Sequence, residues 1–123
     1  MQKILIAVAI LGAITIVLGA FGAHALKEQL SITQIQSFET AVKYQMYHVL
    51  VLLFVNIYQK FPNKTKKNLS LLFFIGILFF SGSIYAITIF NIPASKIWYT
   101  TPIGGTILIL GWLKLSISFF RAK

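Results

Sequence analysis

The sequence predicts an all-α integral membrane protein, a bundle of four spanning helices with both termini in the cytoplasm. Hydrophobic residues make up 58% of the chain and charged residues only 11%, less than half of the roughly 25% found in soluble domains. Four mostly apolar segments have about the 20 residues that a helix needs to cross about 30 Å of hydrocarbon. Lysine and arginine are divided unevenly between the loops, so the net charge of +9 indicates a membrane setting rather than nucleic-acid binding.

The 123 residues have room for a single domain built from these spans. The expected spans are residues 4–25, 41–58, 69–90 and 103–120. The first and third contain no charged residue, whereas the second includes Lys43 and His48 and the fourth includes Lys114. Ala23 to Ala25 resemble a signal-cleavage site, but the apolar run before them exceeds the 7 to 15 residues typical of a secretion signal. We therefore expect the first span to remain uncleaved.

An amphipathic stretch precedes the second span. Its apolar residues recur at helical spacing and are Ile32, Ile35, Phe38 and Val42. Ser31 and Thr33 are alternative starting points, because each is followed three residues later by glutamine and so forms a capping-box pattern. This pattern predicts a short amphipathic helix that either lies at the membrane interface or continues directly into the second span.

Residues typical of helix starts precede the last two spans. Asn68 is a suitable cap for the third span. Thr101 is followed by Pro102, and proline is favoured at the first helical position because its missing N–H costs nothing there. We expect the fourth helix to begin at this pair.

The loop charges predict the orientation. With four spans, both termini share one side with the middle connection. Seven cations are expected on that side, namely Lys3, Lys60, Lys64, Lys66, Lys67, Arg121 and Lys123. Three are expected on the other side, namely Lys27, Lys43 and Lys96. Because positively charged loops stay in the cytoplasm, both termini are predicted to be cytoplasmic, and the cluster Lys60, Lys64, Lys66 and Lys67 is expected to contact anionic lipid of the inner leaflet.

Small residues form stripes along three of the spans. Membrane helices associate through close packing at such residues. The expected packing residues are Gly12, Thr15, Gly19, Gly22, Gly82, Gly104, Gly105 and Gly111. Gly82, or the pair Gly104 and Gly105, is alternatively a place where backbone approaches a ligand. These stripes serve contacts within one chain as well as between chains, so a homo-oligomer or a complex with other membrane proteins stays open.

The second span begins with the densest group of polar residues. Tyr44 and His48 fall on one helical row, with Gln45 beside His48. An ionisable side chain in the hydrocarbon must face the bundle and find a partner. His48 is therefore a proton relay, ligand anchor or metal ligand, or else a neutral imidazole bonded to Tyr44, to Ser81 or Ser83, or to a backbone carbonyl.

Several chemistries lack the residues that they need. The absence of cysteine excludes disulfides and thiolate metal sites. Haem held by His24 and His48 would need both at one depth, which the spans do not provide. No span has a carboxylate in its interior for proton-coupled transport, and no phosphate-binding loop, zinc motif or nucleophile elbow is present. We expect no enzyme activity, no metal and no cofactor.

Four ordered blocks carry a family resemblance. They are GAFGAHAL at residues 19–26, YQMYHVL at 44–50, FSGSIY at 80–85 and TPIGGTILILGW at 101–112. With these blocks the chain resembles the DUF423 (UPF0382) family of small bacterial inner-membrane proteins, which has a eukaryotic transmembrane relative. The resemblance implies a four-helix topology and an inner-membrane location, and it brings no biochemical activity.

Two functional classes follow from these observations. The first is a non-enzymatic membrane component that serves assembly or binds lipid. The second is a small carrier or ligand-handling protein with a polar pocket in the outer leaflet. The residues of that hypothetical pocket are His48, Tyr44, Gln45, His24, Ser81, Ser83 and Tyr85.

Overall fold

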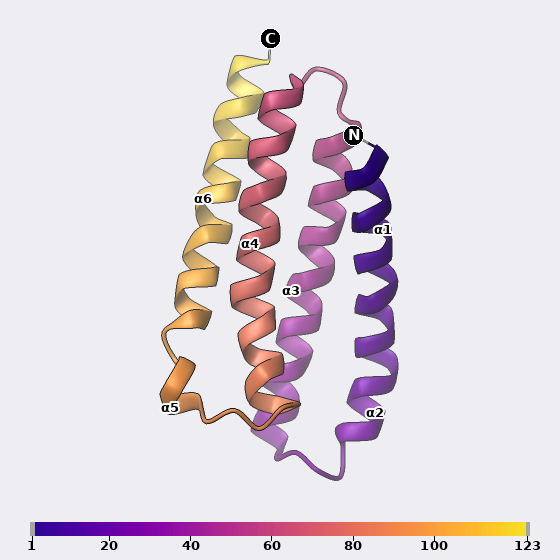
Figure 1. The fold of residues 1–123 in the computed structure, drawn as a ribbon, viewed down its shortest axis with the longest axis vertical. Helices are drawn as coiled ribbons and strands as arrows, with labels where there is room; N and C mark the ends of the chain where they lie inside the picture. Colours follow the sequence, from indigo (N-terminus) through magenta and orange to yellow (C-terminus); the bar gives the residue numbers. More distant parts are fainter. Residues whose placement is uncertain (1, 123) are drawn as a thin grey trace.

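The computed structural model describes residues 2–122, which fold into helices and connecting loops (Figure 1). The elements are α1 (Gln2–Val17), a π-helical turn η1 (Leu18–Gly22), α2 (Ala23–Leu26), α3 (Ile32–Ile57), α4 (Asn63–Thr88), α5 (Ala94–Ile97) and α6 (Thr100–Arg121). Four helices are long and apolar enough to cross a membrane, and the first of them runs through α1, η1 and α2. The predicted fold class, all-α with four spans, is confirmed.

The four long helices form a flattened bundle. They stand in the order α6, α4, α3 and α1, and neighbours in this row run antiparallel (Figure 1). The most extensive packing joins α4 to α6, followed by α3 to α4 and α1 to α3. Both chain ends lie at the same end of the bundle as the loop between α3 and α4, whereas α2 and α5 lie at the opposite end (Figure 1).

The apolar core follows this row of helices. Its members are Val8, Val49, Leu52, Val55, Phe61, Leu69, Phe73, Ile77, Leu108 and Leu115. The contact of α4 with α6 is unusually close at Gly104, where an added Cβ would collide with the backbone of Phe79 and Phe80. Glycine is needed here because only a residue without a side chain lets the two helix backbones approach so far.

The second spanning helix, α3, starts as the capping pattern predicts. The Gln34 N–H donates to Ser31 Oγ, and the Ser31 N–H donates to Gln34 Oε1, which completes a capping box at Ser31 rather than at Thr33. The amphipathic stretch continues directly into the second span, so α3 is one helix of 26 residues. Of the two expected arrangements the structure therefore has direct continuation, and within residues 2–122 the amphipathic stretch forms no separate interfacial helix.

The starts of the last two spans differ from the prediction. Asn68 does not cap the third span, because α4 already begins at Asn63 after Pro62. Proline lacks the N–H that the interior of a helix requires, so α4 does not extend back beyond Pro62. The lysine-rich segment after Pro62 is a good helix former, so α4 includes it. The fourth helix begins at Thr100, within one residue of the expected Thr101, but Thr101 does not act as its cap.

Candidate functional site

His48 lies buried in α3 and both of its ring nitrogens have partners. The side chain is 5% exposed. Nδ1 lies 2.6 Å from the Tyr44 carbonyl oxygen, and the indole N–H of Trp112 on α6 donates to Nε2 over 3.0 Å. Because an indole N–H can only donate, Nε2 must accept, and the ring proton therefore sits on Nδ1 and is donated to Tyr44. His48 is a neutral, fully bonded imidazole in this arrangement.

Gln45 joins three helices. It is 3% exposed, and its Nε2 donates to Thr15 Oγ1 of the first span over 2.7 Å. The Tyr85 hydroxyl of α4 donates to Gln45 Oε1 over 2.8 Å. Thr15 in turn donates to the Leu11 carbonyl. The carboxamide thus uses both of its ends to hold α1 and α4 against α3.

The serines of α4 make the remaining interhelical bonds. Ser81 Oγ donates to the Ala41 carbonyl of α3 over 2.8 Å. Ser83 pairs with the Thr101 hydroxyl at the start of α6. Neither serine bonds to His48, although both were considered as its partners. We call His48, Gln45, Tyr85, Ser81, Ser83 and their bonded partners the polar network.

One residue of the hypothetical pocket joins this network only through its backbone carbonyl, and another lies apart from the network. Tyr44 points outward from α3 and stacks on Phe80, with ring centroids 5.0 Å apart. His24 is exposed on α2 at the end of the bundle. His48 lines none of three clefts of the described residues, which lie beside Lys114 and Arg121, beside Thr15 and Tyr47, and beside Gln34 and Thr88. Residues 2–122 also contain no group of three or more His, Cys, Asp or Glu side chains that could hold a metal ion.

Trp112 is the residue of this network that sequence reasoning missed. The residue is 47% exposed, yet its indole N–H reaches the buried ring of His48. Its bond to His48 spans 64 positions of sequence. No local pattern signals such a pair, because it depends on where α6 packs against α4 and α3.

The glycine stripes fall into two groups. In the first, an added Cβ would lie 3.4 Å or less from an atom of a neighbouring helix, and the residues so affected are Gly12, Gly19, Gly22, Gly104 and Gly111. In the second, Gly82 and Gly105 would gain a Cβ only in ordinary contact, at 3.7 Å from Leu78 and Phe80. The second group does not limit how closely the helices approach.

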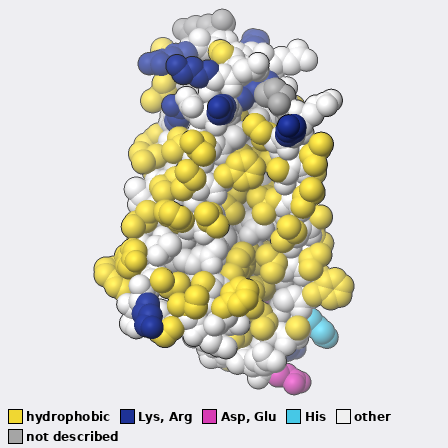
Figure 2. Space-filling view, in the orientation of Figure 1, with side chains coloured by type: hydrophobic (Ala, Val, Ile, Leu, Met, Phe, Trp, Pro, Cys, Tyr) yellow, Lys and Arg dark blue, Asp and Glu magenta, His cyan; other side chains and the backbone are white. Residues whose placement is uncertain are grey.

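Cations gather at the end of the bundle that holds the termini. Figure 2 shows a broad apolar surface between this dark blue group and the acidic side chain at the opposite end. The described cations of this end are Lys3, Lys60, Lys64, Lys66, Lys67 and Arg121. Lys123 was also counted there, but it lies outside the described residues.

Lys66 differs from the other lysines of this end. It is only 7% exposed, and its ammonium group donates to the Asn56 carbonyl oxygen of α3 over 3.1 Å. The Asn56 amide donates to Ser70 Oγ, which ties the same two helices together. Lys60, Lys64 and Lys67 remain exposed, so three of the four lysines expected to meet lipid are accessible.

A bundle of four apolar helices with an internal polar network and one cationic end defines a multi-pass membrane protein. The model of the family described as "Protein of unknown function (DUF423)" matches residues 18–105, and the chain belongs to this family. The chain is 37% identical over 122 residues to a UPF0382 membrane protein of Haemophilus influenzae, covering 99% of this chain and 97% of the relative.

Two further relatives extend the comparison. A UPF0382 membrane protein of Staphylococcus saprophyticus is 43% identical over 103 residues, which is 84% of each chain. The UPF0382 inner membrane protein YgdD of Escherichia coli K12 is 29% identical over 127 residues, covering 97% of this chain and 90% of the relative. The inner-membrane location expected from the sequence is confirmed by this relationship and by the four spans. No solved structure matches the chain.

Proposed function

We propose that this protein is a non-enzymatic component of the inner membrane that binds anionic lipid at the end of the bundle holding its termini. The observation that carries this proposal is the segregation of charge. Lys3, Lys60, Lys64, Lys67 and Arg121 belong to that end of the bundle, whereas both glutamates of the sequence lie toward the other end. Figure 2 shows Lys and Arg side chains gathered at one end and an acidic side chain at the other. A cationic surface beside an anionic leaflet gains about 1 kcal/mol for each lysine or arginine near the headgroups.

The polar network supports a structural rather than a catalytic role for the bundle interior. Its members bond to one another and to backbone carbonyls across α1, α3, α4 and α6. A reactive group needs a free lone pair or proton directed at an accessible substrate, and His48 uses both nitrogens within the protein. The alternative, a carrier with a pocket around His48, has weaker support for the same reason.

Lipid analysis of the purified protein tests this proposal. The protein is extracted in mild detergent, and its retained lipids are quantified by mass spectrometry against the composition of the source membrane. We expect enrichment of anionic over zwitterionic lipid. The triple variant Lys3→Gln, Lys60→Gln, Lys67→Gln should reduce that enrichment at least tenfold, since three charges worth about 1 kcal/mol each are lost.

A matched variant separates charge from position. The variant Lys27→Gln, Lys43→Gln, Lys96→Gln removes the same number of charges from the opposite end of the bundle. It should retain the enrichment of the parent protein. Equal losses in both variants, or a parent protein without anionic preference, would contradict the proposal. A retained polypeptide in place of lipid would favour an accessory role in the assembly of another membrane protein.

A further inference from the structure

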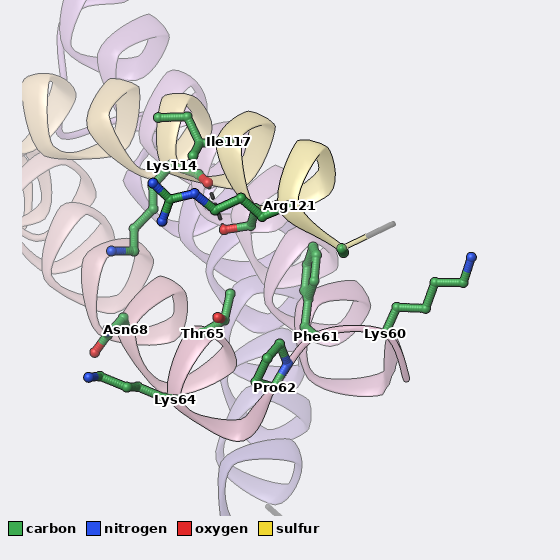
Figure 3. Close-up of a pocket in the computed structure, with 11 residues that line it drawn as sticks. Lys60, Phe61, Pro62, Lys64, Thr65, Asn68, Lys114, Ile117 and Arg121 are labelled. Carbon is green, nitrogen blue, oxygen red and sulfur yellow. Dashed lines mark hydrogen bonds between the residues drawn. The ribbon is translucent and has the colours of Figure 1, made fainter.

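A cleft opens between α4 and α6 at the end of the bundle that holds the termini (Figure 3). Its volume is about 700 Å³. Its two walls are formed by Lys64, Thr65 and Asn68 of α4 and by Lys114, Ile117 and Arg121 of α6. The turn at Phe61 and Pro62 lines the end of the cleft. Because α4 and α6 make the most extensive helix contact of the molecule, these walls are held in a fixed relation.

Three of the wall residues are cations without an acidic neighbour. In Figure 3, the Lys114 and Arg121 side chains extend from α6 on the side where Lys64 lies, whereas Lys60 extends away. Neither glutamate of the sequence lines the cleft, and both belong to the opposite half of the bundle. The three cations in this cleft repel each other. A bound anion offsets that repulsion because it attracts all three.

The cleft also has a defined depth. Lys114 precedes Arg121 by seven residues and so lies about 10 Å further along the helix axis, toward the hydrocarbon. Ile117 lies between them and contributes an apolar wall. On the facing wall, the Thr65 hydroxyl and the Asn68 amide are hydrogen-bond donors. Charge, donors and apolar surface thus meet in one cleft, at the depth where we expect the boundary between headgroups and acyl chains.

We propose that this α4–α6 cleft binds the headgroup of an anionic phospholipid, with Lys64, Lys114 and Arg121 contacting its phosphate oxygens. The proposal rests on the lipid binding proposed above and adds a single defined site to it. The guanidinium of Arg121 can hold two phosphate oxygens at once, whereas the lysines act as point charges. Three cations suit cardiolipin, which carries two phosphates, better than phosphatidylglycerol, which carries one. Phosphatidylcholine should bind weakest because its own cation offsets its phosphate.

Native mass spectrometry of the full chain in detergent tests the site. Cardiolipin, phosphatidylglycerol and phosphatidylcholine are titrated separately, and the dissociation constant of the first bound lipid is measured. We expect affinity to fall in that order. Lys114→Gln and Arg121→Gln should each weaken cardiolipin binding about fivefold or more, which corresponds to one charged contact. Lys114→Arg should retain binding because it keeps the charge.

Lys67→Gln is the matched control. Lys67 lies on the same helix end as Lys64 and is exposed, but it does not line the cleft. Its loss should weaken cardiolipin binding clearly less than Arg121→Gln does, because Lys67 contributes only to the general attraction of this end of the bundle for anionic lipid. Arg121 is exposed in the last turn of α6, so Arg121→Gln is informative even if a Lys114 variant misfolds.

Three other outcomes would contradict the site, the lipid-binding function or the assignment to lipid. Equal weakening by Lys67→Gln and Arg121→Gln would replace the site by diffuse charge attraction, while the proposed lipid-binding function would stand. Equal affinity for all three lipids would overturn both. Inorganic phosphate that binds as tightly as cardiolipin would show a site for a free anion and overturn the assignment to lipid.

Discussion

At the scale of single residues, a polar side chain within the hydrocarbon has to find its partner inside the protein, since lipid offers none. His48 meets this requirement with the Tyr44 carbonyl and the Trp112 indole. The sequence alone identified His48 as a residue that needs partners and included a backbone carbonyl among the alternatives. It could not identify Trp112, because that contact depends on the tertiary placement of α6.

Replacement of Trp112 by phenylalanine isolates this contact. Trp112→Phe removes the N–H donor but keeps an aromatic ring beside Phe73 and His48. The expected loss of unfolding free energy is about 0.6 kcal/mol, the average for a hydrogen bond between membrane helices. Reversible unfolding in mixed micelles measures it, and Trp98→Phe is the control because Trp98 is exposed in the loop region. A loss of several kcal/mol would mean that the ring itself, rather than the bond, holds α6 in place.

At the scale of the elements, the contact between α4 and α6 depends on where glycine stands. Periodicity selected both Gly104 and Gly105 as packing residues, since neighbouring positions in a sequence do not reveal which one faces the partner helix. In the structure, Gly104 meets the backbone of Phe80, whereas Gly105 has space for a methyl group. One helical step of about 100° therefore separates a position that requires glycine from one that does not.

This pair of adjacent glycines provides a matched comparison. Gly104→Ala should destabilise the protein by roughly 1–3 kcal/mol, because the added methyl group forces the two helix backbones apart. Gly105→Ala should be close to neutral or slightly stabilising, since alanine is the better helix former. Thermal unfolding of both variants in the same detergent measures the difference. Equal destabilisation by the two substitutions would mean that α6 faces α4 in a different rotation.

The helix boundaries show what limits prediction at this scale. The number of spans and their approximate bounds follow from hydropathy, because each apolar run matches the thickness of the membrane. Hydropathy does not predict that α4 starts at Asn63 instead of Asn68. Lysines in the first turns of α4 fall outside an apolar window, although lysine is a good helix former. For the same reason, hydropathy did not predict that Lys64 belongs to α4 and lines one wall of the α4–α6 cleft.

At the scale of the whole molecule, the cationic end was predictable and the cleft within it was not. Counting lysine and arginine in loops requires only the order of the spans. The cleft requires α4 and α6 to be neighbours, which brings Lys64 together with Lys114 and Arg121 from the far end of the sequence. Lys66 shows the opposite case, since it was counted with the surface lysines but turns inward to Asn56.

Charge segregation also predicts how the whole molecule is oriented, with the termini and the α3–α4 loop in the cytoplasm. The chain contains no cysteine, so single cysteines can be introduced against a silent background. Gln59→Cys lies in the α3–α4 loop and Ser95→Cys lies in α5 at the other end, and both positions are exposed. In spheroplasts, an impermeant maleimide should label Ser95→Cys and spare Gln59→Cys, and inverted membrane vesicles should reverse this pattern. The opposite labelling would place the cationic end outside the cell, where the α4–α6 cleft would face the outer leaflet and the positive-inside rule would fail for this protein.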